Sequence, residues 1–501
     1  MKIELLSKGL GKVPCDLLVL GHFAGVKRLS ESAQLVDEAL EGAISQLIEQ
    51  DEFEAKFGQV LMFPTFGKIA AKKVAVIGLG EKKHLTVDAL RKIGGHLVKL
   101  AERAHADRLV TSLMGVGVNE IDAFQSAHAL TEGALLSEYR FHAFHGTKRQ
   151  AEKKPKQLAT LTLCDEDAKN VKLAKEGIER AEILAKATNV ARDLVNTPSS
   201  HMGPAQLAAE AQKIVGKNIE IKTLDVAEME KLGMNAALAV GRGSHHAPIG
   251  VHLSHIPRGA KKKIAIVGKA VTFDSGGLSL KPADGMMTMK IDMAGAATVI
   301  GLFHALADLK LPVEVHGIFL AVENMPNGNA YRPGDVVTAM NGMTIEVLNT
   351  DAEGRVTLAD ALCYAVQQQP DVIIDLATLT GAMVVALGEE IAGLFSSNTK
   401  LTERLKNASL ETGEMLWEMP LFEGYNDHIK SKIADLKNIG QRGSAGSISA
   451  ALFLKPFVGD IPWAHLDIAG TCYTEKESRP DQPYGASGYG VRLLVGYLER
   501  L

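Results

Sequence analysis

The chain has 501 residues, of which 46% are hydrophobic and 23% charged, a composition typical of globular proteins and long enough for more than one domain. A net charge of −4 excludes a chain-wide attraction to nucleic acid or to an acidic membrane surface. The four cysteines lie far apart and form no CxxC pair, so we expect free thiols in a reducing compartment instead of disulfides or a zinc knuckle.

The sequence predicts neither a targeting segment nor a membrane segment. The stretch from Met1 to Leu6 carries an acid where a signal peptide would have its apolar core. The most apolar stretch, 372–387, is interrupted by Asp375 and Gly381 and is shorter than the ~20 apolar residues of a membrane helix. We therefore expect a cytoplasmic protein without a membrane segment.

Residues 1–165 are predicted to form a separate α/β domain. Apolar runs at 16–21 and 73–78 end in glycine and are typical of buried strands, whereas 35–49 and 87–103 have helical periodicity. Strands that alternate with helices indicate a largely parallel sheet. No group of metal-type ligands is apparent in this part of the sequence.

A polar segment and a long helix follow. Residues 147–157 are rich in Lys, Arg and Gln, which predicts a solvated loop or hairpin tip; a nucleic-acid contact is the alternative, but no aromatic residues are interleaved. Residues 158–164 are predicted to be a strand. The periodicity of 167–195 predicts one helix that stops before Pro198, so we expect 166–196 to link the first domain to a second.

Residues 197–501 are predicted to form a larger α/β domain, with a central mixed sheet flanked by helices. The expected helices are 204–215 and 294–309, and the expected strands are 235–241, 250–255, 264–268, 313–322, 345–348 and 372–376. Ligands of open α/β sheets bind beyond the carboxyl ends of strands. Polar residues that follow these strands are therefore candidates for a functional site.

Two carboxylates and a guanidinium, those of Asp351, Glu353 and Arg355, lie within five residues between strand 345–348 and a helical pattern. An acid in front of a helix is often only an N-cap. Acids this close together, however, repel each other unless positive charge lies between them.

Metal ions are the usual source of positive charge between such acids, and a second acidic segment upstream supports this interpretation. Lys269, Asp274, Lys281 and Asp292 follow strand 264–268, and two glycines after Asp274 allow a tight loop. Two divalent cations would balance the four carboxylates of both segments. The lysines and Arg355 would then be available for substrate charge.

These segments resemble a known family. Asn349-Thr350-Asp351-Ala352-Glu353-Gly354-Arg355 resembles the signature of the leucyl aminopeptidase family, the cytosol aminopeptidases of the bacterial PepA type. The segment from Lys269 to Asp292 resembles the other metal segment of that family in order and spacing, and the similarity extends downstream of about Arg192. Ala270 departs from the glycine that is more frequent in the family, which adds a methyl group and puts no ligand in doubt.

The resemblance implies a leucyl aminopeptidase, a metal-dependent exopeptidase that releases N-terminal, preferably Leu-like, residues from peptides by attack of a metal-bridging hydroxide. Its implied metal ligands are Lys269, Asp274, Asp292, Asp351 and Glu353, with Asp274 and Glu353 as bridges. The metals would be two divalent ions, Mn²⁺ or Zn²⁺ and possibly Mg²⁺, among which the sequence does not choose.

Two cations receive catalytic roles. A fixed cation stabilises the oxyanion of the tetrahedral intermediate, a role we assign to Lys281. The resemblance implies that Arg355 holds a bicarbonate that accepts the proton of water.

The resemblance also implies that the first side chain of the substrate lies among Met289, Thr378, Leu379, Gly381 and Ala469.

The resemblance further implies a homo-hexamer, whose first domain is macro-domain-like, non-catalytic and involved in assembly. Three alternatives stay open. One is a DNA-binding regulator on the same scaffold, which the net charge does not support. Another is a structural component with a dead site, and the third is a narrow dipeptidase of the Cys-Gly type, which differs only in substrate.

Overall fold

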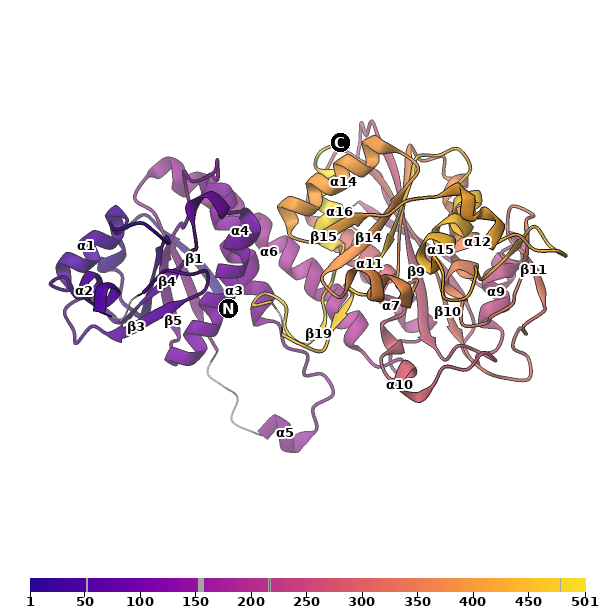
Figure 1. The fold of residues 1–501 in the computed structure, drawn as a ribbon, viewed down its shortest axis with the longest axis horizontal. Helices are drawn as coiled ribbons and strands as arrows, with labels where there is room; N and C mark the ends of the chain where they lie inside the picture. Colours follow the sequence, from indigo (N-terminus) through magenta and orange to yellow (C-terminus); the bar gives the residue numbers. More distant parts are fainter. Residues whose placement is uncertain (51–52, 152–156, 215, 217, 478) are drawn as a thin grey trace. The chain divides into compact units, whose positions relative to one another are not determined.

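The computed structural model describes residues 1–50, 53–151, 157–214, 216, 218–477 and 479–501. The chain forms two compact units, each visible in Figure 1. The N-terminal unit comprises Met1–Ala185 and Lys476–Pro483, and the C-terminal unit comprises Lys186–Glu475 and Tyr484–Leu501. The domain boundaries that we placed at 165 and 197 stay predictions.

The N-terminal unit contains a six-stranded sheet in the order β1-β6-β5-β2-β4-β3, parallel except for β3. Its strands are β1 Lys2–Leu6, β2 Cys15–His22, β3 Val60–Pro64, β4 Ala71–Gly78, β5 Arg108–Ser112 and β6 Thr160–Cys164. Its helices are α1 Glu31–Ala39, α2 Ala43–Gln50, α3 Val87–Ala104, α4 Ala123–Glu138 and α5 Thr147–Ala151, with short 3-10 turns η1 Leu10–Lys12 and η2 Lys82–His84. The predicted strands at 16–21 and 73–78 are confirmed.

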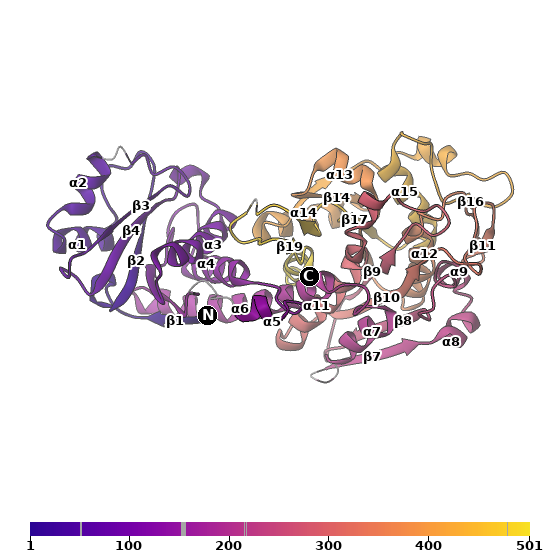
Figure 2. The ribbon, with the colours of Figure 1, turned by 90° about the horizontal axis from the view of Figure 1, so that it is seen from below.

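Helices cover both faces of this sheet. Leu17 and Val19 of β2 pack in a core with α3 and α4, whereas Leu18 and Leu20 pack in a second core with α1 and α2. Figure 2 shows β2, β3 and β4 between these two pairs of helices. Since successive strand side chains point to opposite faces, an unbroken apolar run is what a strand covered on both sides requires.

Two predictions for this unit are corrected by the structure. The single helix expected at 35–49 is wrong, because the chain turns at Glu41 and Gly42, whose φ angles of 59° and 81° lie in the left-handed region. The loop or hairpin tip expected at 147–157 contains the short helix α5 at its start. Residues 152–156 lie outside the described part of the chain.

The long helix α6, Ala168–Asn196, begins in the N-terminal unit and ends in the C-terminal unit, close to the range predicted for it.

The C-terminal unit is built on an eight-stranded mixed sheet in the order β15-β14-β17-β13-β9-β10-β8-β7. These strands are β7 Ile219–Leu224, β8 Ile249–His255, β9 Lys263–Asp274, β10 Glu314–Asn324, β13 Val372–Ala377, β14 Ile391–Ser396, β15 Met415–Glu418 and β17 Trp463–Asp467. The central strands β17, β13, β9 and β10 are parallel to one another. Their carboxyl ends therefore meet at one edge of the sheet.

Two small sheets accompany it, made of β11 Val336–Thr338, β12 Thr344–Glu346 and β16 Leu436–Lys437, and of β18 Tyr473–Thr474 and β19 Gly485–Ala486. The helices are α7 Pro204–Gln212, α8 Val226–Lys231, α9 Asn235–Gly241, α10 Ala283–Met286, α11 Ala294–Asp308, α12 Gly354–Gln367, α13 Gly381–Leu387, α14 Thr399–Thr412, α15 Gly446–Leu454 and α16 Val491–Leu498. Short 3-10 turns are η3 Met289–Ile291, η4 Glu423–His428 and η5 Lys455–Phe457. The helix predicted at 204–215 ends at Gln212, and Val215 lies outside the described residues.

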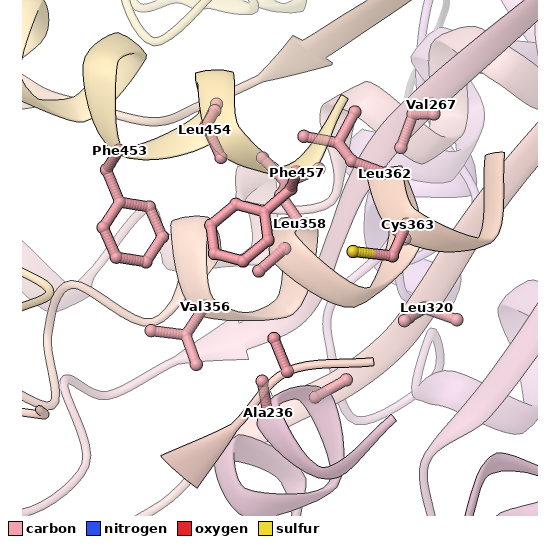
Figure 3. Packing of buried hydrophobic residues seen from close by; sticks show 14 of the residues in the cluster. Ala236, Val267, Leu320, Val356, Leu358, Leu362, Cys363, Phe453, Leu454 and Phe457 are labelled. Carbon is pink, nitrogen blue, oxygen red and sulfur yellow. The ribbon is translucent and has the colours of Figure 1, made fainter. Parts of the chain in front are cut away.

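One face of the large sheet is covered by α9, α12 and α15. Val267 of β9 and Leu320 of β10 pack there against Leu358 and Leu362 of α12, with Phe453 of α15 in the same cluster (Figure 3). This core fixes α12 against β9 and β10, and with it the residues at the start of α12.

The other face carries α11, which approaches the strands unusually closely. A Cβ atom on Gly268 would lie 2.5 Å from the carbonyl carbon of Gly295, and one on Gly295 would collide with the carbonyl oxygen of Leu376. Gly268 therefore permits backbone contact instead of ending the strand. The prediction that the strand ends at Gly268 is wrong, because β9 continues to Asp274.

Two further strand predictions are corrected. Residues 235–241 form the helix α9, consistent with three alanines in seven residues, since alanine has the highest helix propensity and a short apolar run does not distinguish strand from helix. Residues 345–348 contribute only part of the three-residue β12, which lies in a small sheet and not in the large one.

One described segment, Ala283–Asp308, passes the length and hydropathy criteria for a membrane span. Of its most apolar window, 67% is buried inside the structure, and it consists of three separate elements, α10, η3 and α11. The segment supplies a helix of the protein core.

His128 of α4 is a buried histidine held in its neutral form. Its Nδ1 lies 3.3 Å from the carbonyl oxygen of Gly177, and its Nε2 lies 2.8 Å from Nη1 of Arg180. This geometry fits a ring that donates through Nδ1 and accepts at Nε2. Burial lowers the pKa of His128 from 6.5 to about 4, and the attraction of Glu132 offsets this only in part.

Because the pKa of His128 is lower in the folded than in the unfolded chain, its contribution to stability is full above pH 6.5 and is lost as the pH falls towards 4. We expect acidification from pH 7 to 4.5 to weaken the N-terminal unit by up to about 3 kcal/mol through this residue, at ~1.4 kcal/mol per pKa unit. Hydrogen-exchange protection of α4 measures it. His128→Gln, which does not titrate, is the control, and an equal pH dependence in both proteins would contradict the assignment.

Candidate metal centre

Three segments bring acidic residues to the carboxyl edge of the large sheet. Asp274 is the last residue of β9, Asp292 lies between η3 and α11, and Asp351 and Glu353 lie in the loop that enters α12. Lys269 projects from within β9 to the face covered by α12, because it alternates with Val267 and Val271. Each segment is held in place by the packing of its own helix or strand.

The predicted ligands form one cluster. Carboxylate oxygens of Asp274, Asp351 and Glu353 lie within 4.8 Å of one another. Nζ of Lys269 joins Asp292 to this group, since it lies 2.7 Å from Oδ1 of Asp292 and 2.9 Å from Oε1 of Glu353. The residues come from segments almost eighty positions apart in the chain and converge as expected.

Lys281 enters the same cluster from the loop that follows β9. Its Nζ lies 2.8 Å from Oδ2 of Asp274 and 2.6 Å from Oδ1 of Asp351. Each lysine thus bridges two carboxylates. Lys281 retains some exposure, with 15% of its side chain accessible, whereas Lys269 retains 4%.

The pKa values of these groups reflect an excess of buried negative charge. Burial raises the pKa of Asp274, Asp292 and Asp351, and repulsion between acids adds to this, while the two lysines offset it only in part. Burial alone would lower the pKa of Lys269 and Lys281, but attraction by the surrounding carboxylates outweighs it and raises both. Four carboxylates therefore share two ammonium groups.

The residues present fit divalent metal ions. Carboxylate oxygens suit Mg²⁺ and Mn²⁺ and also bind Zn²⁺. Oδ2 of Asp292 is buried and has no hydrogen-bond partner within the described residues, so its lone pairs are available to coordinate a metal ion. Lys269 could bind a metal only after losing its proton, because an ammonium group has no lone pair.

Arg355 lies in the first turn of α12 and is buried. Its Nε has no hydrogen-bond partner in the part of the chain that the structure describes. Burial lowers the pKa of Arg355 to about 10, while Glu353 and Asp467 oppose this shift. A buried guanidinium with an unused donor, beside the first N–H groups of a helix, is suited to a small anion.

Of the residues predicted for the substrate pocket, Thr378 has a direct contact with this cluster. Its Oγ1 donates to Oδ1 of Asp292 at 2.7 Å, and its carbonyl accepts from Lys269 at 3.0 Å. Leu379 follows in the chain, Gly381 opens α13, and Ala469 follows β17. Met289 begins η3, three residues before Asp292.

Two polar residues without a predicted role tie the segments together. Oγ1 of Thr350 donates to the carbonyl of Gly276 at 2.6 Å and accepts from the N–H of Ser279 at 2.8 Å. Nδ2 of Asn324 donates to Oδ1 of Asp274 at 2.8 Å and to the carbonyl of Thr350 at 2.9 Å. The position of Asn324, just after the apolar run 313–322 at the ligand edge, is a signal that could have indicated it.

A carboxylate cluster with an unpartnered buried oxygen, at the carboxyl edge of a group of parallel strands, is the kind of site that metal-dependent enzymes with an α/β fold use. Residues 189–495 match the catalytic domain of the cytosol aminopeptidase family, and residues 19–148 match its N-terminal domain. The chain belongs to the cytosol aminopeptidase family, whose members are metal-dependent exopeptidases.

The chain is similar to curated relatives and to solved structures over almost its whole length. A probable cytosol aminopeptidase of Persephonella marina is 41% identical over 500 residues, 99% of each chain, and one of Roseiflexus castenholzii is 42% identical over 482 residues, 96% of this chain and 95% of its own. A mutant of tomato leucine aminopeptidase has a TM-score of 0.87 at 34% identity, covering 100% of this chain and 97% of its own. The bottromycin maturation enzyme BotP in complex with Mn has a TM-score of 0.84 at 33% identity, covering 97% and 99%.

Thr350→Val removes the hydroxyl that joins the two acidic segments. It leaves the carbonyl of Gly276 and the N–H of Ser279 without a partner, and each such buried group costs about 1–3 kcal/mol. We expect a lower Tm and weaker Mn²⁺ binding by calorimetry. Thr399→Val, at an exposed position, is the control and should change stability by less than about 0.5 kcal/mol. Unchanged Mn²⁺ affinity in Thr350→Val would contradict this role.

Proposed function

We propose that the protein is a two-metal aminopeptidase that releases N-terminal residues from peptides and prefers Leu-like first residues. The observation that carries the proposal is the convergence of Asp274, Asp351 and Glu353, whose oxygens lie within 4.8 Å of one another, with Asp292 joined to them through Lys269. Its membership of the cytosol aminopeptidase family supports it.

The metal ligands in this proposal are Lys269, Asp274, Asp292, Asp351 and Glu353. Mn²⁺, Zn²⁺ or Mg²⁺ fits these donors, and BotP is a similar structure that was solved in complex with Mn. When bound, such a pair of ions lowers the pKa of a water and polarises a carbonyl group.

Lys281 is proposed to stabilise the negative oxygen that develops when the scissile carbonyl is attacked. Its ammonium lies at the cluster, is partly exposed, and is raised in pKa, so it remains charged. A fixed positive charge that attracts the reacting oxygen more strongly once this oxygen becomes negative lowers the barrier without tightening substrate binding.

Arg355 is proposed to hold a bicarbonate that accepts a proton during the reaction. The unpartnered Nε and the start of α12 both favour an anion at this place. The guanidinium would orient the anion through paired hydrogen bonds, a geometry that lysine does not reproduce.

Met289, Thr378, Leu379, Gly381 and Ala469 are proposed to line the pocket for the first side chain of the substrate. Thr378 already contacts Asp292, so a residue bound there lies beside the metal ligands. A Cβ atom on Gly381 would meet no heavy atom within 4 Å, which leaves space for a substrate side chain. An apolar pocket of this kind discriminates by size through the area that the side chain buries.

Peptides are the expected substrates, and the cytoplasm is the proposed location, as the names of the cytosol aminopeptidase relatives suggest. We also propose a homo-hexamer on the family resemblance alone. Light scattering in solution would measure its mass.

Chelation should abolish hydrolysis of leucine p-nitroanilide, because the proposed reaction needs bound metal ions. Readdition of Mn²⁺ or Zn²⁺ should restore it, and calorimetry should count two ions per chain. Circular dichroism before and after chelation serves as the control for folding. Activity that survives complete metal removal would rule the proposal out.

Lys281→Ala should lower kcat by about 10²–10³-fold with little change in KM, because its contact with substrate is made mainly in the transition state. Steady-state kinetics on leucine p-nitroanilide measures both constants. Lys430→Ala removes an exposed lysine with a surface ion pair and should leave both unchanged. A rise in KM at constant kcat would instead assign Lys281 to ground-state binding.

A further inference from the structure

Asp467 is a fully buried carboxylate that no part of the proposed mechanism uses. It ends β17 and is 0% exposed. Its Oδ1 accepts from the N–H of Leu379 at 3.3 Å and from the N–H of Ala469 at 3.2 Å, and its Oδ2 accepts from Oγ1 of Thr380 at 2.6 Å. All three donors belong to the two segments that we assign to the substrate pocket.

The segment from Thr378 to Thr380 is thereby held from two sides. On one side, Thr378 contacts Asp292 with its hydroxyl and Lys269 with its carbonyl. On the other side, Leu379 and Thr380 are bound by Asp467. The separation between this segment and Ala469 is therefore set by the side chain of Asp467 together with the pairing of β13 and β17, where the N–H of Ile468 donates to the carbonyl of Ala377 at 2.8 Å.

Burial raises the pKa of Asp467, and the attraction of His465 and the hydrogen bonds to Asp467 offset this effect only in part. His465, two residues earlier on β17, lies 2.6 Å through Nδ1 from Oδ1 of Asp375, its cross-strand neighbour. Burial lowers the pKa of His465, but the attraction of Asp375 and Asp467 outweighs this effect and raises it. Asp467 in turn attracts Arg355 and opposes the lowering of its pKa by burial.

We propose that Asp467 is a positioning residue that sets the width of the pocket for the first side chain of the substrate, and hence the preference for a large apolar residue. The inference rests on the proposed function. Asp467 holds the 378–380 segment and Ala469 at one separation, and it acts through these residues without touching the substrate.

Two variants of Asp467 distinguish the effect of its negative charge from the effect of its hydrogen bonds. In Asp467→Asn the amide oxygen can still accept from Leu379 and Ala469, and the amide N–H can donate to Thr380, whose hydroxyl can turn towards Ser447 at 2.8 Å. All three connections survive in Asn, whereas Asp467→Ala removes them. Thr380→Val removes the connection of Thr380 to Asp467 together with its cap on α13 and its contact with Ser447, whereas Thr380→Ser retains a hydroxyl for all three.

The readout is the ratio of kcat/KM for leucine p-nitroanilide to that for alanine p-nitroanilide. We expect Asp467→Ala to lower this ratio about tenfold, mainly through KM for the leucine substrate, in line with the 10–200-fold that apolar contacts contribute to discrimination. Asp467→Asn and Thr380→Ser should stay within about threefold of the wild type, and Thr380→Val should fall between. The inhibition constant of free L-leucine should stay near the wild-type value in Asp467→Asn and Thr380→Ser, rise in Thr380→Val and rise most in Asp467→Ala.

A ratio unchanged in Asp467→Ala, at wild-type metal content, overturns the inference. If Asp467→Ala does not fold, the pair Thr380→Val and Thr380→Ser decides: a lower ratio in Val alone supports the inference, and equal ratios overturn it. A wild-type protein without chelator-sensitive hydrolysis would instead refute the proposed function. The two failures are therefore distinguishable.

Discussion

Four carboxylates, of which those of Asp274, Asp292 and Glu353 are buried and that of Asp351 is partly exposed, lie close enough to repel one another, so the site depends on positive charge between them. In this structure Lys269 and Lys281 supply part of that charge, each between two acids. The remaining imbalance appears as raised pKa values of the acids. The same imbalance is what makes the site receptive to divalent cations.

Neutral hydrogen bonds hold this repelling group together. Thr350 and Ser279 join the loop after β9 to the loop before α12, and Asn324 connects both to the end of β10. The side chains of Thr350, Ser279 and Asn324 carry no charge, so they add no further repulsion to the cluster. Charged residues thus provide the chemistry, and uncharged ones keep the segments at a fixed spacing.

The acidic segments could be predicted from the sequence because their carboxylates are dense along the chain and follow apolar runs. The two-unit α/β architecture could be predicted from periodicity, since the hydrophobic residues of buried strands and of amphipathic helices recur with different periods. Local pattern failed at 235–241, where a short apolar run fits either structure, and at 345–348, where an apolar run forms a minor sheet. It also misread Gly268, whose role depends on a helix distant in sequence. Asn324 follows an apolar run at the ligand edge, but the roles of Asn324 and Asp467 depend on partners that only the folded chain brings near.

The backbone contact between Gly268 and Gly295 has a consequence for how such a centre could be altered. Asp292 comes just before α11, and the start of that helix rests directly on the main chain of two strands. No flexible side chain lies between them to take up a displacement, so a substitution that lifts the helix would carry Asp292 away from Lys269 as a rigid body. Substitutions that adapt this centre to an ion of another size are therefore expected mainly in the loop that carries Asp351 and Glu353.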